Sequence, residues 1–123
     1  MLFRSEYSRE AAHLFEAGLR AYNQSSYSEC TQRLSRAIEL YDETYKTDTP
    51  TDTVKMQHAQ ICFINGLVYL CADDVTKAHD YVMRARRIDN APLAYSLAAS
   101  ITAYLNNKTT EAAEIIRDRK SVV

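Results

Sequence analysis

The chain contains few of the residues that interrupt regular structure. Its 123 residues include two glycines, two prolines and no tryptophan. An all-β protein needs many turns, so these low numbers argue against that class. No apolar run approaches the ~20 residues that a membrane-spanning helix requires. We therefore expect an all-α chain without membrane insertion.

The chain also has no marked excess of either charge. Its net charge of −1 gives no global reason to expect a nucleic-acid partner. The three cysteines are an odd number without close pairing, and the first residues contain no apolar stretch of signal-peptide length. These features favour a reducing compartment, so we expect a cytoplasmic protein, with the nucleus as the alternative. The length suits a single domain, 1–123, and 46% hydrophobic residues suffice for a core.

A pattern of large and small residues occurs twice. In each copy a glycine is followed at identical offsets by a large, a small, a large, a small and a large residue. The first copy consists of Gly18, Tyr27, Cys30, Leu34, Ala37 and Leu40. The second consists of Gly66, Val75, Ala78, Val82, Ala85 and Ile88. Because small residues at fixed offsets let paired helices pack closely, the pattern predicts a repeat architecture.

These copies resemble tetratricopeptide repeats (TPRs), which are helix–turn–helix units of about 34 residues. A weaker third copy starts at Ala94, with Ile101 in place of the glycine and Arg117 at an apolar position. Gly18 and Gly66 are 66 − 18 = 48 positions apart, so we interpret the surplus as an insertion between the first two units. The resemblance implies antiparallel helix pairs, about six helices in all, stacked as a short solenoid. The implied units are 8–46, 54–90 and 92–120, with a loop at 46–53.

Apolar periodicity and turn residues predict where the six helices lie. Polar clusters at 47–53 and 106–108 separate some of them. Asp73 and Asp74 suit the start of the fourth helix, and the arginines at 84–87 suit its end, because of the helix dipole. The other predicted ranges are 8–22, 27–45, 54–70, 93–105 and 110–119.

In the TPR family the first helix of each pair lines a concave groove. If the residues at the matching motif positions have the same role here, the groove is lined mostly by apolar and aromatic side chains. The lining lacks the lysines and asparagines by which some TPR proteins clamp terminal carboxylates, so an apolar peptide or amphipathic helix is the expected ligand. The alternative is that these residues form ordinary core. The implied lining consists of Ala12, Phe15, Leu19, Tyr22, Gln60, Phe63, Leu67, Leu70, Tyr95, Ala98, Thr102 and Leu105.

No residue pattern indicates catalysis or a cofactor. The carboxylates fall at predicted turns or exposed helix faces, and neither a nucleophile-and-base arrangement nor a phosphate-binding glycine loop is visible. His58 and Cys62 lie four positions apart, a spacing that could hold a metal, but a closed zinc site needs four ligands. We therefore expect no enzymatic activity, no metal and no cofactor.

The sequence thus predicts a protein–protein interaction adaptor that binds an apolar peptide or helix of a partner. One alternative is a homodimeric structural module of a larger complex, because the short last helix leaves an apolar end for a second copy. Another is a helper domain of a secretory-pathway enzyme complex, since residues 18–22 resemble the repeat domains of collagen prolyl-hydroxylase relatives. Glycans at Asn23 or Asn107 would favour this last alternative.

Overall fold

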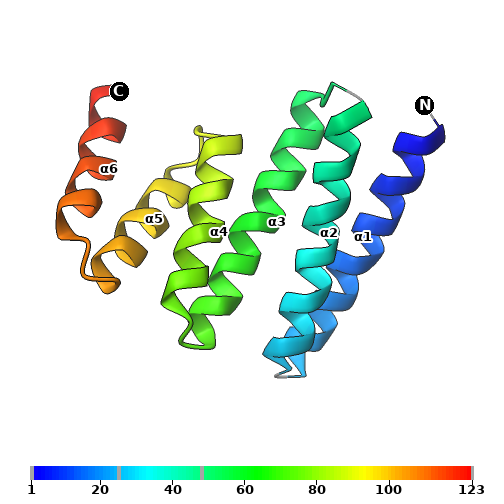
Figure 1. Cartoon of the computed structure of the whole chain (residues 1–123), viewed down its shortest axis with the longest axis horizontal. Coiled ribbons are helices and arrows are strands. Elements are labelled where there is room, and N and C mark those ends of the chain that lie inside the picture. Colours follow the sequence, from blue (N-terminus) through cyan, green and yellow to red (C-terminus); the bar gives the residue numbers. More distant parts are fainter. Residues whose placement is uncertain (1, 25, 48, 123) are drawn as a thin grey trace.

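Six α-helices make up most of the part of the chain that the computed structural model describes, residues 2–24, 26–47 and 49–122. No strand occurs among these residues, so the all-α prediction is confirmed for them. The side chains of residues 2–8, 11, 12, 15, 22 and 118–122 lie outside this description. The helices are α1 (Leu2–Asn23), α2 (Tyr27–Thr47), α3 (Asp52–Cys71), α4 (Val75–Ile88), α5 (Leu93–Leu105) and α6 (Thr109–Val122) (Figure 1).

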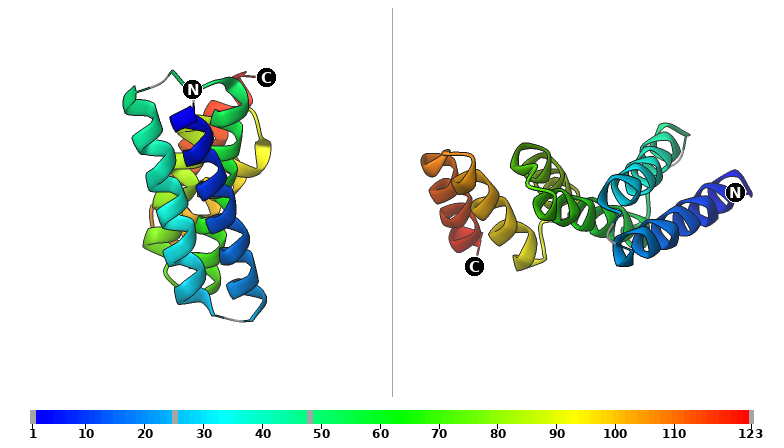
Figure 2. Two further views of the ribbon diagram at one scale, coloured as in Figure 1. Left: turned by 90° about the vertical axis from the view of Figure 1, so that its right-hand side faces the viewer. Right: turned by 90° about the horizontal axis from the view of Figure 1, so that it is seen from below.

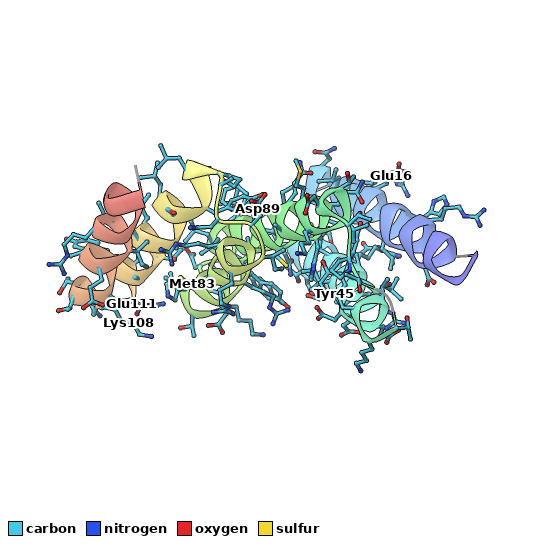
Figure 3. The ribbon with its side chains drawn as sticks, turned by 90° about the horizontal axis from the view of Figure 1, so that it is seen from above. Glu16, Tyr45, Met83, Asp89, Lys108 and Glu111 are labelled. Carbon is cyan, nitrogen blue, oxygen red and sulfur yellow. The ribbon has the colours of Figure 1, made fainter. Side chains whose placement is uncertain are left out.

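Each helix contacts the helix that follows it in the chain. The contacts are most extensive within α1–α2, α3–α4 and α5–α6, while α2–α3 and α4–α5 connect these pairs. Figure 1 shows the helices in chain order from one end of the molecule to the other. Seen from above, α1, α3 and α5 follow one long side, and α2 and α4 follow the opposite side (Figure 3). The first helix of each pair therefore faces a different side from the second helices α2 and α4.

The same backbone hydrogen bond closes all three pairs. In each turn a backbone N–H donates to the carbonyl five residues earlier, and in two of them the residue before the donor has a φ of 63°. These are the features of a Schellman-type helix end, in which a left-handed residue lets the chain reverse. The left-handed residues are Asp73 and Asn107. The three bonds run from Ser26 to Ala21 (2.8 Å), from Asp74 to Tyr69 (2.9 Å) and from Lys108 to Ala103 (2.8 Å).

Substitutions of Asn107 test whether this turn geometry contributes to stability. A left-handed conformation costs a residue with a Cβ about 1–2 kcal/mol, less for asparagine and nothing for glycine. We expect Asn107→Ala to lower the free energy of unfolding by about 1 kcal/mol, whereas Asn107→Gly should leave it unchanged or raise it. Urea unfolding of the two variants measures the difference. Equal losses in both would contradict the turn assignment.

Both glycines of the repeated pattern lie where a second helix comes close. A Cβ built on Gly66 would lie 2.7 Å from Val82 Cγ1 and 3.0 Å from the Ala78 carbonyl oxygen. A Cβ on Gly18 would meet the residues at the same offsets, Leu34 Cδ2 at 3.0 Å and the Cys30 carbonyl oxygen at 3.4 Å. The close packing predicted from the two copies is therefore confirmed, at equivalent residues of each pair.

The third pair repeats this arrangement one residue earlier than the sequence comparison placed it. Its first helix ends five residues after Ser100, as α1 and α3 end five residues after their glycines. The Ser100 hydroxyl donates to the Ala112 carbonyl at 2.9 Å, the carbonyl equivalent to those near Gly18 and Gly66. The placement of Ile101 at the glycine position is therefore wrong, and the distance from Gly66 to Ser100 is 34 positions. Ile101 is exposed because a bulky side chain would not fit at the close approach.

The extra residues between the first two units belong to helices. Counted from the glycine of its own pair, α2 ends seven residues later than α4. Counted back from Gly66 and Ser100, α3 begins seven residues earlier than α5. These additions account for the 14 positions by which 48 exceeds 34, and each amounts to about two helical turns. The predicted loop at 46–53 is accordingly too long, since α2 reaches Thr47 and α3 begins at Asp52. Figure 2 shows the two lengthened helices in two further views.

The helix starts are explained by their caps. Thr51 accepts a hydrogen bond from the Val54 N–H at 3.2 Å and so starts α3. Asp74 accepts one from the Lys77 N–H at 3.2 Å and starts α4, as the acidic pair in the sequence predicted. The range 93–105 is confirmed at both ends. The leading residues extend the predicted first helix back to Leu2, and α6 is longer than predicted, since it ends at Val122.

Candidate apolar binding face

Exposed apolar side chains gather on the first helix of each pair. Nine large hydrophobic side chains are exposed among those that the structure describes, and eight of them belong to α1, α3 or α5. The ninth is Ile116 on α6, and α2 and α4 contribute none within the described part. Single exposed apolar residues are normal, but these eight are concentrated on the first helices, and five of them belong to α5. The eight are Leu19, Met56, Leu67, Leu93, Leu97, Ile101, Tyr104 and Leu105.

Three equivalent positions of each first helix hold large apolar residues, and one of these positions is exposed in all three pairs. The position after the glycine or its serine counterpart holds Leu19, Leu67 and Ile101, and Leu19 and Leu67 are each 37% exposed. The position three residues before it holds Phe15, Phe63 and Leu97. The position four residues after it holds Tyr22, Leu70 and Tyr104. We call the described members the apolar face: Leu19, Phe63, Leu67, Leu70, Leu97, Ile101 and Tyr104.

The predicted lining residues fall into three groups in the structure. Leu19, Gln60, Leu67 and Leu105 are exposed, and Phe63, Leu70 and Ala98 are half-buried. Tyr95 and Thr102 are buried. The predictions for Ala12, Phe15 and Tyr22 concern side chains outside the described part of the chain.

The one-residue shift of the third pair explains the buried group. Residues one position earlier, Leu97 and Ile101, face outward where Ala98 and Thr102 were expected to do so. The sequence comparison missed Leu97, Ile101 and Tyr104 as lining residues. Aligning the turn residue Asn107 with Asp73 would have found them, because both are residue types that tolerate the left-handed conformation.

The Thr102 side chain is buried and forms its hydrogen bonds inside the protein. It is 2% exposed, and its hydroxyl lies 2.7 Å from His79 Nδ1 while also donating to the Ala98 carbonyl at 2.9 Å. The other ring nitrogen of His79 lies 3.2 Å from Glu111 Oε1. This network joins α4, α5 and α6, so Thr102 serves the packing of the third pair.

A cavity of about 580 Å³ adjoins the apolar face between α3 and the start of α5. Gln60 and Phe63 line it from α3, and Pro92 and Tyr95 line it from the α4–α5 connection and α5. The rings of Phe63 and Tyr95 are 4.8 Å apart. The structure thus brings together three of the predicted lining residues around one hollow, which is large enough for an apolar side chain of a partner.

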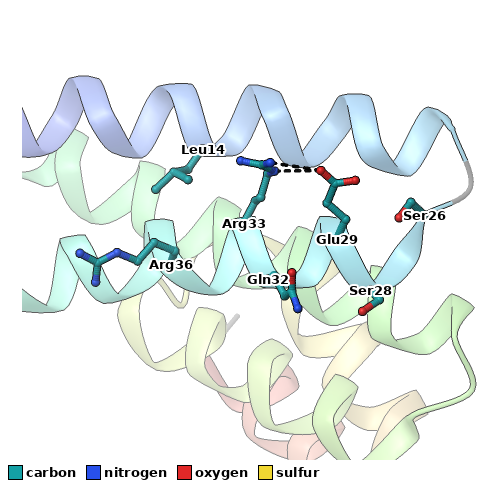
Figure 4. Close-up of a pocket in the computed structure, with 7 residues that line it drawn as sticks. All are labelled: Leu14, Ser26, Ser28, Glu29, Gln32, Arg33 and Arg36. Carbon is teal, nitrogen blue, oxygen red and sulfur yellow. Dashed lines mark hydrogen bonds and ion pairs between the residues drawn. The ribbon is translucent and has the colours of Figure 1, made fainter.

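A second hollow, of about 570 Å³, lies between α1 and α2, and most of the residues that line it are polar or charged (Figure 4). Its arginines are already paired along α2: Arg33 with Glu29 at 3.1 Å, and Arg36 with Glu39 at 3.1 Å. Exposed ion pairs of this kind contribute little to stability, and they leave no strong unpaired charge to attract an anion. This hollow therefore offers less to a ligand than the apolar face does.

The pair His58 and Cys62 lies in the interior. The ring of His58 stacks on Tyr41 with centroids 5.2 Å apart, and its Nδ1 lies 2.8 Å from the Tyr45 hydroxyl. Burial raises the pKa of the Cys62 thiol to about 12, so the thiol stays protonated and is a poor metal ligand. No group of three or more His, Cys, Asp or Glu residues that could hold a metal occurs in the described ranges.

Two further findings bear on the class of protein. Among the described residues, no helix is both long enough and apolar enough to cross a membrane. No known protein-family model matches the chain. The assignment of a function therefore depends on the geometry of the apolar face.

Proposed function

We propose that the protein is a non-catalytic adaptor of the cytoplasm or nucleus that binds an amphipathic helix or apolar segment of another protein. In this proposal the three helix pairs are divergent TPR-like units stacked as a short solenoid, and the apolar face is its groove. The observation that carries the proposal is the exposed apolar side chain at one equivalent position of α1, α3 and α5, held by Leu19, Leu67 and Ile101.

The repeated geometry supports the assignment to TPR-like units. The turn bond and the close approach at the glycine position recur at fixed offsets, and the distance from Gly66 to Ser100 is 34 residues. A repeat of this length with two helices per unit is the TPR pattern. Stacks of such units present extended surfaces along their first helices, and these surfaces serve recognition.

The chemistry of the face selects the class of partner. Its side chains are aliphatic or aromatic, and Leu67 lies in the middle pair, between Leu19 and Ile101 of the outer pairs. A helix that presents apolar residues at i, i+3, i+4 and i+7 can place its anchors along such a strip. Buried anchors of this kind supply most of the affinity of helix-in-groove complexes.

Leu67→Glu tests the proposal. A carboxylate desolvated against an apolar ligand should weaken binding about 100-fold, whereas helicity should persist because Leu67 is already partly exposed. The experiment is a selection from a random peptide library on the wild-type chain, followed by calorimetric titration of the selected peptide. The matched control is Gln32→Glu, which places the same charge at an exposed position of α2. Equal affinity for the Leu67→Glu variant and the wild type would contradict the assignment.

A further inference from the structure

The α5 part of the apolar face differs from the rest in exposure and charge. Helix α5 contains no charged residue along its 13 positions. Five of its large apolar side chains are 44–63% exposed, namely Leu93, Leu97, Ile101, Tyr104 and Leu105. By contrast, α1 interleaves its apolar residues with Glu16 and Arg20, and α3 carries Lys55 and Gln60. The surface of α5 is therefore more apolar than a site for transient peptide binding needs to be.

The opposite end of the molecule does not offer a complementary surface. Tyr95 and Thr102 of α5 are buried against the preceding pair. The equivalent positions of α1 hold His13 and Arg20, and both are exposed. A head-to-tail contact that continued the stack would place these polar residues against α6 of another copy and would leave the exposed side of α5 uncovered. A two-fold contact that pairs α5 with itself avoids this mismatch, since neither side brings a charge.

The spacing of the exposed residues suits such a two-fold contact. Leu93, Leu97, Ile101 and Leu105 recur every four residues, so an antiparallel pair of α5 helices brings Leu97 next to Ile101 of the second copy, and Leu93 next to Leu105. Ala94 and Ala98 lie beside this strip, and Ala94 is exposed. Small residues at these positions let the two helix backbones approach closely.

The area of the strip is close to what a stable contact requires. From their exposed fractions, the five side chains present about 500–600 Å² in each copy, or roughly 1,100 Å² for the pair, and specific interfaces begin near 1,000 Å². Interfaces at this lower limit are weak ones, so we take a dissociation constant of about 10 μM as the working value for the test, since area alone does not set the affinity.

We propose that the protein forms a two-fold symmetric dimer in which α5 packs antiparallel against α5 of a second copy. This contact goes beyond the proposed partner binding and uses the five exposed large apolar side chains of α5, namely Leu93, Leu97, Ile101, Tyr104 and Leu105. The α1 and α3 part of the apolar face, with Leu67 at its centre, stays available to a partner. Loss of one function therefore does not imply loss of the other.

Sedimentation equilibrium of the wild type and two charge variants tests the dimer. The wild type should pass from its chain mass of 14.0 kDa toward twice that mass as its concentration rises through about 10 μM. Leu97→Glu and Ile101→Lys should each stay monomeric at about tenfold higher concentration, because each buries an unpaired charge in the contact. Leu67→Glu, on α3, is the matched control and should dimerise like the wild type.

Mixing the two monomeric variants tests the antiparallel register. In an antiparallel pair Glu at 97 meets Lys at 101 of the other copy, so the equimolar mixture should regain the dimer mass. A mixture that stays monomeric, or a wild type that stays at 14.0 kDa at about 1 mM, would overturn the proposal. Circular dichroism checks that both variants are folded. If one is not, Tyr104→Asp at the end of the strip replaces it as the monomeric variant.

Discussion

Gly66→Ala is expected to lower the free energy of unfolding by about 1–2 kcal/mol, even though alanine is the better helix former. The added Cβ would lie 2.7 Å from Val82 Cγ1, 3.0 Å from the Ala78 carbonyl oxygen and 3.3 Å from the Val82 nitrogen. Two of these three atoms belong to the backbone of α4, so a side-chain rotation cannot relieve the clash. The α3 and α4 axes must separate, which loosens the packing around Val82.

Gly18→Ala is the matched control for this prediction. Its added Cβ would meet Leu34 Cδ2 at 3.0 Å and Cγ at 3.1 Å, while the nearest backbone atom is 3.4 Å away. The end of a leucine side chain can move, and the helix propensity gained from replacing glycine is about 1 kcal/mol. We therefore expect Gly18→Ala to change the stability by less than about 0.5 kcal/mol. Urea unfolding of both variants measures the two changes in stability. Similar losses of stability in both would contradict the inference that α3 and α4 approach more closely at Gly66 than α1 and α2 do at Gly18.

A second large effect is expected on acidification, because His58 is buried without charge. His58 is 2% exposed, and burial, together with the positive charge of Arg84, lowers its pKa from 6.5 to about 4. Its Nε2 lies 3.5 Å from Asp42 Oδ1, which would favour protonation. The Asp42 side chain is, however, half exposed to water, and burial of its carboxyl raises its own pKa. Desolvation of the imidazole therefore dominates.

The sign of the effect follows from the lowered pKa. Below pH 6.5 the unfolded chain binds a proton at His58 that the folded chain does not bind until about pH 4. The contribution of His58 to stability is thus complete above pH 6.5 and is lost between pH 6.5 and about 4, by up to about 3 kcal/mol. The raised pKa of Asp42 acts in the opposite direction, because the folded chain takes up that proton first as the pH falls.

Urea unfolding at pH 7 and pH 4.5 measures this dependence. His58→Gln should remove most of the stability difference between the two pH values, whereas His13→Gln should retain it, because His13 is exposed. Tyr41, Tyr45 and Cys62 surround His58, and burial raises the pKa of each above its usual value, so none of them titrates in this range. Parallel pH profiles for the wild type and His58→Gln would show that another group causes the loss.

Local sequence signals predicted the helices well where caps and turn residues mark them. The range of α5 follows from Pro92 before it and Asn106 after it, and Asp74 marks the start of α4. The helical surplus between the first two units was not predicted. The Thr-rich stretch 47–53 suggests a long loop, but contacts between α2 and α3, including the stacking of Tyr41 on His58, hold both helices further than local propensity indicates.

The candidate site was predicted in part. Leu67 and Phe63 follow from the glycine at position 66, which fixes the register of α3. The register of α5 could not be fixed in this way, because serine replaces glycine at residue 100 and one serine among small residues gives no distinct signal. The sequence holds a weaker signal in Asn107, which matches Asp73, but the shared turn bond from Lys108 to Ala103 that establishes the alignment depends on the folded backbone.

The most direct test of the proposed function is methyl NMR of the chain with the most strongly selected peptide bound. The proposal predicts contacts from the peptide to the methyl groups of Leu19 and Leu67 on α1 and α3. The methyl group of Met83, on α4 at the opposite side of the molecule, should be unaffected (Figure 3). Contacts centred on Met83 or on α2, with Leu19 and Leu67 unchanged, would contradict the assignment of the apolar face as the binding surface.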